Sequence, residues 1–168
     1  MKVHLREWRT EDKESLVKYA NNKKIADNMR DIFPNPYTIS DAMQWIAASE
    51  NKTAETVFAI DADEQFVGGC GIHLKEDVYK YSAEIGYWIA EPFWGKGIAT
   101  ETIKLMLEKT SQNFPLIIRV YAEVFEHNKA SMRVLEKNGF HLESIRKKAV
   151  IKSNVIMDDY VWVKLLNK

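Results

Sequence analysis

Hydrophobic positions along the chain follow two periods, and each period predicts one kind of element. Alternating apolar and polar residues are typical of strands, and apolar residues recurring every three or four positions are typical of helices. The predicted strands cover residues 3–8, 55–60, 65–74, 81–90 and 115–124, followed by two long strands that turn at residues 152–154. The predicted helices cover residues 11–20, with an irregular continuation to residue 30, then 40–49, about 99–113 and 128–138.

Turn and capping residues separate these elements. Thr10 and Ser40 are the expected N-caps of the first helices, because their hydroxyls can accept hydrogen bonds from helix amides. Asn128 opens the last helix, and Gly139 is its expected C-cap. The two prolines of "DIFPNPYTIS" predict a loop. The resulting order, β-α-α-α-β-β-β-α-β-α-β-β, predicts a mixed sheet with helices on its faces, in a single domain over residues 1–168.

Composition narrows the classes of partner. Hydrophobic residues make up 46% of the 168 positions and charged residues 29%, which is normal for a soluble globular domain. Lys+Arg and Asp+Glu balance at 24 each, so we expect neither nucleic acid nor an anionic membrane as partner. Cys70 is the single cysteine, which excludes an intrachain disulfide and suits a reducing cytoplasm. The sequence shows no signal peptide and no bilayer-spanning run, so we expect a cytoplasmic protein.

Two glycines one residue apart, Gly95 and Gly97, precede the helix through Ala99. Glycine lets the backbone approach a ligand closely and permits a positive φ. Amide N–H groups at a helix start attract anions, and Lys96 adds a positive charge. The segment "WGKGIAT" is therefore either an anion site or simply a strand-to-helix turn. It matches neither the phosphate-loop pattern nor G-x-G-x-x-G.

The segment "NKASMRVLEKNGF" supplies a second motif. Asn128, Ser131 and Leu135 lie three and four residues apart and share one helical face. Together with "EIGYWIAEPFWGKGIATE" upstream, this segment resembles the GNAT superfamily of acyl-CoA-dependent N-acetyltransferases. Within that superfamily it is most similar to the RimJ/RimL branch, the ribosomal-protein N-terminal acetyltransferases. The element order agrees from about Leu5 to Leu165, and the specific motifs lie between residues 84 and 140.

The resemblance implies an α+β GNAT fold, whose twisted and mostly antiparallel sheet has about seven strands with helices on both faces. It also implies acetyl-CoA as co-substrate, without a metal. The diphosphate would lie on loop amides, and pantetheine would pair with the preceding strand end and with an asparagine amide. The residues implied in cofactor binding are Trp88, Ile89, Trp94, Gly95, Lys96, Gly97, Ile98, Ala99, Thr100, Asn128 and Ser131. Many members carry Arg or Gln at the position of Trp94, so diphosphate binding here would depend more on backbone N–H groups.

Acetyl transfer to an amine needs a proton acceptor, because an alkylammonium has a pKa near ~10. Glu84 is the candidate base, directly or through water, since it is a carboxylate in an otherwise apolar strand. A solvated strand glutamate or a structural ion pair is the alternative. The oxyanion of the tetrahedral intermediate needs N–H donors, for which we expect the backbone of Ile89 or a neighbour.

The departing thiolate raises a separate question. Ser131 is the candidate near the CoA sulfur, as in this branch, with a helix-packing hydroxyl as the alternative. Asn128 could likewise be a helix N-cap as well as a pantetheine ligand. Many GNAT members carry a general-acid tyrosine seven residues after the asparagine, where this chain has Leu135. Ser131 or water would then protonate the thiolate if protonation is needed.

Cysteine and histidine chemistry is not indicated. Cys70 could suggest a ping-pong acyl-enzyme, but it lies in an apolar strand without a cationic neighbour in sequence, so we interpret it as a small buried hydrophobe. His4, His73, His127 and His141 show no metal-ligand spacing, and we interpret them as surface or core residues.

The sequence thus predicts an acetyl-CoA-dependent N-acetyltransferase that acts by direct transfer to a primary amine. The closest branch suggests a protein or peptide N-terminal α-amine as acceptor. A small-molecule amine (a polyamine, amino acid or aminoglycoside) is the alternative within this chemistry. A non-catalytic acyl-CoA-binding regulatory domain is the alternative of another class. The expected partners are acetyl-CoA and the amine acceptor, and a homodimer stays open.

Overall fold

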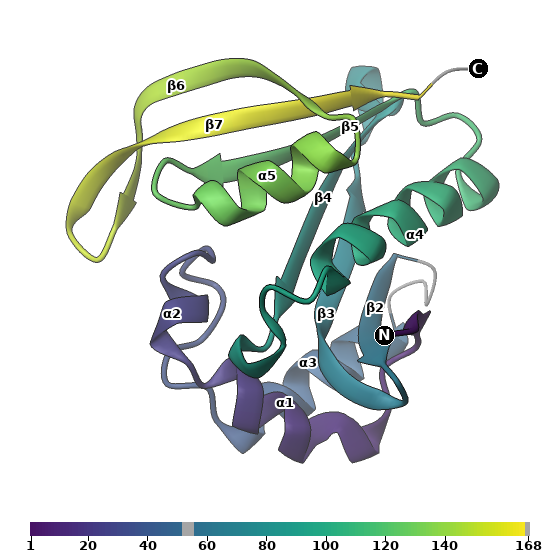
Figure 1. Cartoon of the computed structure of the whole chain (residues 1–168), viewed down its shortest axis with the longest axis vertical. Helices are drawn as coiled ribbons and strands as arrows, with labels where there is room; N and C mark the ends of the chain where they lie inside the picture. The colour runs from purple at the N-terminus through teal and green to yellow at the C-terminus, as the bar shows by residue number, and fades with distance from the viewer. Residues whose placement is uncertain (52–55, 167–168) are drawn as a thin grey trace. The chain divides into compact units, whose positions relative to one another are not determined.

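The computed structural model describes residues 1–51 and 56–166 (Figure 1). The α-helices in these ranges are α1 Lys13–Ala20, α2 Lys23–Ala26, α3 Ile39–Asn51, α4 Ile98–Asn113 and α5 Lys129–Lys137. The strands are β1 Val3–Arg6, β2 Val57–Ala62, β3 Gln65–Leu74, β4 Ser82–Ile89, β5 Arg119–Phe125, β6 His141–Lys152 and β7 Val155–Leu165. Their order confirms the predicted order. The expected start of the second strand at Glu55 lies outside the described residues.

The strands form one mixed sheet in the order β1-β2-β3-β4-β5-β7-β6. Neighbouring strands pair antiparallel in β1–β2, β2–β3, β5–β7 and β6–β7, whereas β4 pairs with β5 in parallel. The parallel pairing joins residues 82–84 of β4 to residues 119–121 of β5. This is the mixed, mostly antiparallel sheet of the GNAT fold, as expected from the resemblance.

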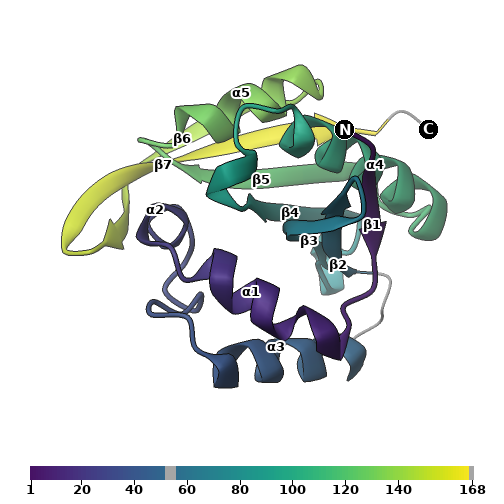
Figure 2. The same cartoon turned by 60° about the horizontal axis from the view of Figure 1, so that its bottom comes forward.

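The chain forms two compact units, and β3, β4 and α4 pass from one to the other. The first unit contains residues 1–71 and 87–102. In it α1 and α3 lie side by side, as Figure 2 shows. Its buried core is built from aromatic and aliphatic side chains of these helices, of β2 and β3, and of the connecting segments before α1 and α3: Trp8, Leu16, Ala20, Tyr37, Ala42, Ile46, Val57, Ala59 and Phe66.

The second unit contains residues 72–86 and the chain from residue 103 onward. Along β5, alternate side chains are buried, namely Val120, Ala122 and Val124. Helix α5 lies beside β5 and β7 (Figure 1) and buries Met132 and Leu135. The β6–β7 hairpin turns at Ser153 and Asn154, both with positive φ, which confirms the predicted turn.

The two N-caps predicted for the first helices, Thr10 and Ser40, are wrong. Thr10 lies inside a short 3-10 helix, Thr10–Asp12, where the Asp12 carboxylate accepts the backbone N–H of Arg9 at 2.9 Å. Ser40 is the second residue of α3 rather than its cap. Thr38 caps that helix instead: its hydroxyl accepts the N–H of Asp41, and the Asp41 carboxylate accepts the N–H of Thr38 at 2.8 Å. This reciprocal pair satisfies two backbone N–H donors at the start of the helix. Ser40 lies two residues later, inside the helix, and cannot form the same pair.

Other boundaries moved by a few residues. The irregular helix after residue 20 is a short α2, capped by the Asn22 side chain, which accepts the N–H of Lys24. Strand β5 begins at Arg119 rather than at residue 115. Gly139 follows the C-cap residue Asn138 and has a φ of 79°, so it is the left-handed residue after the helix end.

Candidate active site

The glycine loop, defined here as residues 94–100, lies in the first unit and connects β4 to α4. A short 3-10 helix, Glu91–Phe93, leads into it, and residues 94–97 are exposed. The Ile98 side chain is buried and anchors the start of α4. The Glu101 N–H donates to the Gly97 carbonyl at 3.1 Å. The helical hydrogen-bond ladder therefore begins at Glu101, and the preceding amides stand at the helix start, as an anion site requires.

The loop glycines have the backbone conformation of a turn and open space beside them. Gly95 and Gly97 adopt φ values of 74° and 78°, a left-handed conformation that other residues rarely adopt. A Cβ built at either position would meet no heavy atom within 4 Å. The turn conformation alone explains the glycines, and the open space beside them is room that a ligand can use.

Trp94 fastens this loop to the end of β4. Its indole Nε1 donates a hydrogen bond to the Ile89 carbonyl at 2.6 Å, while 45% of the residue's surface stays exposed. Lys96 lies with its Nζ 5.2 Å from the centre of the Phe93 ring, which holds a positive charge beside the loop. Both side chains therefore have structural partners within the loop region, in addition to the roles that the sequence predicted.

Trp88 has its side chain in the aromatic core. Its ring packs at 6.0 Å from Phe33 and 6.1 Å from Phe66, measured between ring centres. The β3 backbone also comes close here, since a Cβ at Gly68 would lie 2.1 Å from the Trp88 carbonyl oxygen. The Trp88 indole is therefore partly buried against this core.

A second attachment of this region was not predicted. Asn22 donates from Nδ2 to Glu91 at 2.7 Å, and Lys24 forms an ion pair with the same carboxylate. These hydrogen bonds, from Lys24 first and from Asn22, lower the pKa of Glu91. They connect α2 to the 3-10 helix that precedes the glycine loop. No local signal marks the contact, because its partners lie 69 and 67 residues apart.

Glu84 lies in the second unit, on β4, and is paired with a lysine. Its Oε2 is 3.0 Å from the Nζ of Lys75, and the two side chains are 13% and 33% exposed. Tyr121 is the register partner of Glu84 on β5, and Lys75 Nζ is 5.5 Å from the Tyr121 ring centre. The alternative of a structural ion pair is thus present in the structure. An ion pair of this kind does not by itself exclude a role for Glu84 as base.

His73 also faces Glu84. The backbone N–H of Lys75 donates to the Ser82 carbonyl at 3.1 Å across the adjacent strands β3 and β4. In an antiparallel pair this register places His73 directly opposite Glu84, with both side chains on one face. His73 is exposed, as expected for a surface histidine, but its place opposite Glu84 was not predicted. Correct pairing of the two strands would have been the signal for it and for Lys75.

Asn128 and Ser131 lie at the start of α5 in the second unit. The Oδ1 of Asn128 accepts the backbone N–H of Ser131 at 3.2 Å, so the N-cap alternative for Asn128 is confirmed. Its Nδ2 group still carries the N–H donors that a pantetheine carbonyl would need. Leu135 is fully buried in the core. An aliphatic side chain therefore occupies the position at which the family resemblance led us to look for a general-acid tyrosine.

Cys70 is buried on β3, with a relative exposure of 7%, as its interpretation as a small hydrophobe requires. Among residues 1–51 and 56–166, no group of three His, Cys, Asp or Glu side chains could hold a metal ion. In the same ranges, no helix combines the length and the apolar character needed to cross a membrane.

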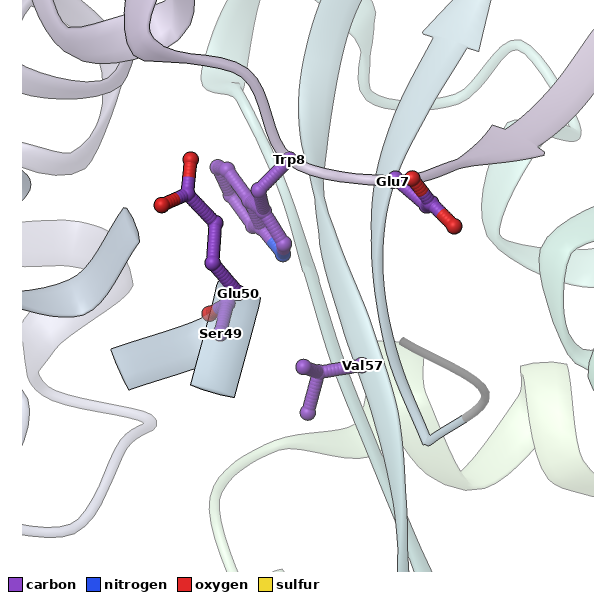
Figure 3. A pocket seen from close by; sticks show the side chains of 5 residues that line it. All are labelled: Glu7, Trp8, Ser49, Glu50 and Val57. Carbon is purple, nitrogen blue, oxygen red and sulfur yellow. The ribbon is translucent and has the colours of Figure 1, made fainter. Parts of the chain in front are cut away.

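The described cavities are not lined by the predicted residues. One of about 130 Å³ in the first unit is lined by Glu7, Trp8, Ser49, Glu50 and Val57, as Figure 3 shows. The indole N–H of Trp8 is buried there without a partner in the part of the chain that the structure describes. A groove of about 410 Å³ in the second unit runs along α4 and includes Lys104 and Lys164. Neither contains a residue that the sequence assigned to the active site.

The predicted residues therefore fall into two groups. Trp88, Ile89 and the glycine loop form one continuous segment of the first unit. Glu84, Asn128 and Ser131 belong to the second unit, where Glu84 is surrounded by residues that the sequence analysis did not select.

Comparison with known proteins identifies the family of the chain. A family model described as "Acetyltransferase (GNAT) domain" matches residues 2–141. The probable N-acetyltransferase YjcK of Bacillus subtilis is 41% identical over 106 residues, which span 63% of this chain and 58% of that protein. The ribosomal-protein-serine acetyltransferase of Escherichia coli is 24% identical over 152 residues, which span 81% of this chain and 84% of that protein.

A solved structure of RimL, a ribosomal L7/L12 α-N-protein acetyltransferase in complex with coenzyme A, has the same fold. It superposes with a TM-score of 0.86 at 19% identity, covering 99% of this chain and 95% of that one. The fold, the family model and the sequence relatives lead to one conclusion. The chain belongs to the GNAT family of N-acetyltransferases.

Proposed function

We propose that this GNAT N-acetyltransferase moves the acetyl group of acetyl-CoA directly to the α-amino group of a protein or peptide. The observation that carries the proposal is the glycine loop. Its two left-handed glycines leave open space beside the amides that start α4, and this suits the diphosphate of the donor. We propose that Gly95 to Thr100 bind the diphosphate, with Lys96 adding charge.

For the rest of the donor, the family resemblance supports individual roles. The backbone at Trp88 and Ile89 is proposed to pair with pantetheine, and the amide of Asn128 to donate to it. Ser131 is proposed to lie near the CoA sulfur. Asn128 can cap α5 and bind pantetheine together, because the cap uses Oδ1 and the ligand would use Nδ2.

The proposed reaction begins with proton removal. Glu84 accepts a proton from the acceptor ammonium, directly or through water, and leaves a neutral amine. The nitrogen lone pair then attacks the thioester carbonyl carbon, and the resulting oxyanion is stabilised by the backbone N–H of Ile89 or a neighbour. The C–S bond breaks as the intermediate collapses. The nitrogen gives up its second proton, which reaches the thiolate through Ser131 or water, since Leu135 has no proton to give. Ser131 thus ends the reaction protonated, and the products are the amide and the free thiol of CoA.

The identity of the acceptor amine is the most specific part of this proposal. The Escherichia coli relative is named for serine of ribosomal proteins, and its match spans most of both chains. This supports a peptide α-amine as the acceptor here. We also propose that residues 1–168 act as one domain, that two copies form a homodimer, and that the protein works in the cytoplasm, where the free thiol of Cys70 would stay reduced.

A panel of acceptors tests the proposal by free-thiol release from acetyl-CoA. The panel should hold peptides with varied first residues, polyamines, amino acids and aminoglycosides. Each peptide needs a matched version whose α-amine is already acetylated and whose lysine side chain stays free. Release with the unblocked peptides alone supports the proposal. Release with small amines alone favours the small-molecule alternative, and tight acetyl-CoA binding without any release favours the non-catalytic one.

A further inference from the structure

We propose that Lys75 is a positioning residue that holds the Glu84 carboxylate ready to accept a proton. This inference depends on the proposed function of Glu84 as the base. Lys75 directly follows β3, and its Nζ lies 3.0 Å from Glu84 Oε2. No local pattern marks the pair, since the two residues become neighbours only when β3 and β4 come together.

Burial gives the pair its importance. The Glu84 side chain is only 13% exposed, and an ionised carboxylate this far from water is costly without a partner of opposite charge. Lys75 supplies that charge and fixes the direction of one carboxylate oxygen. A charge-assisted hydrogen bond of this kind is stronger than a neutral one, so it also limits the rotation of the carboxylate.

Lys75 is itself held in place. Partial burial acts to lower the pKa of Lys75, but hydrogen bonds to Tyr121 and Glu84 outweigh it, and the pKa is raised. Tyr121 in turn has the Arg119 guanidinium 5.6 Å from its ring centre, and Arg119 is bound by both oxygens of Glu143. The lysine thus stays protonated and orders its two neighbours. It can orient the base without exchanging a proton in the reaction.

The test is a double-mutant cycle on kcat, measured with acetyl-CoA and an amine that the wild-type protein accepts. Lys75→Met removes the charge and keeps the stem, and we expect kcat to fall roughly 10- to 100-fold, the range for one hydrogen bond to a charged group. The acetyl-CoA KM should change less than about twofold. Lys75→Arg should restore most of the loss. In a Glu84→Gln background, Lys75→Met should cause no further loss, because it acts through the same carboxylate.

Lys80→Met is the matched control, since Lys80 lies on the same connection with its Nζ over the Tyr81 ring at 5.5 Å. Its kcat should equal that of the wild type. Melting temperatures show whether each variant folds. If Lys75→Met does not fold, Lys75→Arg is the variant that is measured instead. Wild-type kcat in Lys75→Met, or a loss that adds to that of Glu84→Gln, would overturn the proposed role of Lys75. The assignment of Glu84 as base would not be affected. Wild-type kcat in Glu84→Gln would overturn the assigned base, and the role of Lys75 with it.

Discussion

The indole N–H of Trp94 donates to the Ile89 carbonyl at 2.6 Å, which joins the glycine loop to the end of β4. Two segments that the sequence assigned to different parts of the donor, the diphosphate and the pantetheine, are therefore fixed to each other by one side chain. The bond also gives Trp94 a structural role at a position where the family resemblance led us to expect Arg or Gln. Trp94 therefore holds the loop in place and adds no positive charge to it.

Trp94→Phe should weaken acetyl-CoA binding by about 2- to 10-fold, the equivalent of one neutral hydrogen bond. The ring is kept and only the donor is lost, so the loop gains freedom that binding must then remove. Isothermal titration with acetyl-CoA measures the effect. Trp162→Phe is the control, because the Trp162 indole N–H is buried without a hydrogen-bond partner in the described chain. An unchanged Kd in Trp94→Phe would mean that the bond does not order the site.

Gly97→Asn should raise the acetyl-CoA KM by roughly tenfold or more, which corresponds to a loss of about 1.4 kcal/mol in binding free energy. Asparagine tolerates the left-handed φ of 78°, so the backbone can stay in place while a side chain enters the open space that the diphosphate would use. Gly97→Val would add backbone strain and confuse the two effects. Gly139→Asn, at a φ of 79° outside the loop, is the control and should bind acetyl-CoA normally. Normal affinity in a folded Gly97→Asn protein would remove the diphosphate from this loop.

Glu84→Gln should lower kcat by roughly 10²–10⁴-fold, the usual range for a positioned base, with acetyl-CoA affinity nearly unchanged. Raising the pH should restore part of the rate, since more of the acceptor then arrives as free amine. A full pH–rate profile of both proteins is the measurement. A purely structural glutamate would instead give a lower melting temperature and parallel losses in binding and rate, without a special response to pH.

Cys70→Ala should keep most of the activity, because a buried thiol on β3 is not needed for direct transfer. Initial-rate kinetics should show a ternary complex. Mass spectrometry after incubation with acetyl-CoA alone is the sharper check. An acetyl group trapped on Cys70 in the absence of acceptor would contradict direct transfer.

Acid should remove the stabilising effect of the cap on α3. The Thr38 hydroxyl and backbone N–H both donate to Asp41 and lower its pKa below the ordinary 3.8. A carboxylate whose pKa is lower in the folded than in the unfolded protein stabilises the fold at pH values above its unfolded-state pKa. This stabilisation is lost as the pH falls through its folded-state pKa. Asp41→Asn should therefore lower the melting temperature at pH 7, and the difference from wild type should shrink below about pH 4.

Ser40→Ala is the matched control for this cap. Ser40 is the residue that local sequence rules select as the cap, yet it lies inside α3. Its replacement should leave the melting temperature nearly unchanged at every pH. A loss as large as that of Asp41→Asn, with the same dependence on pH, would contradict the capping pair formed by Thr38 and Asp41.

Local chemistry allowed the sequence by itself to determine the order of the elements and most of their boundaries. The hairpin turn at Ser153 and Asn154, the left-handed Gly139 after α5 and the cap by Asn128 each depend on residues within a few positions. The two glycines of the loop belong to the same class. On α3 the sequence analysis selected Ser40 as the cap, whereas Thr38, two residues earlier, forms the capping hydrogen bond.

The surroundings of each candidate were decided only by the tertiary structure. The sequence selected Glu84 as a carboxylate in an apolar strand. The pairing of β3 with β4 brought Lys75 and His73 to it, and the pairing of β4 with β5 brought Tyr121. Strand register is set by contacts between residues far apart in the chain, and a shift of one residue turns every side chain to the other face. For that reason a candidate base could be chosen from the sequence, whereas the residues that lie beside it in the sheet could not.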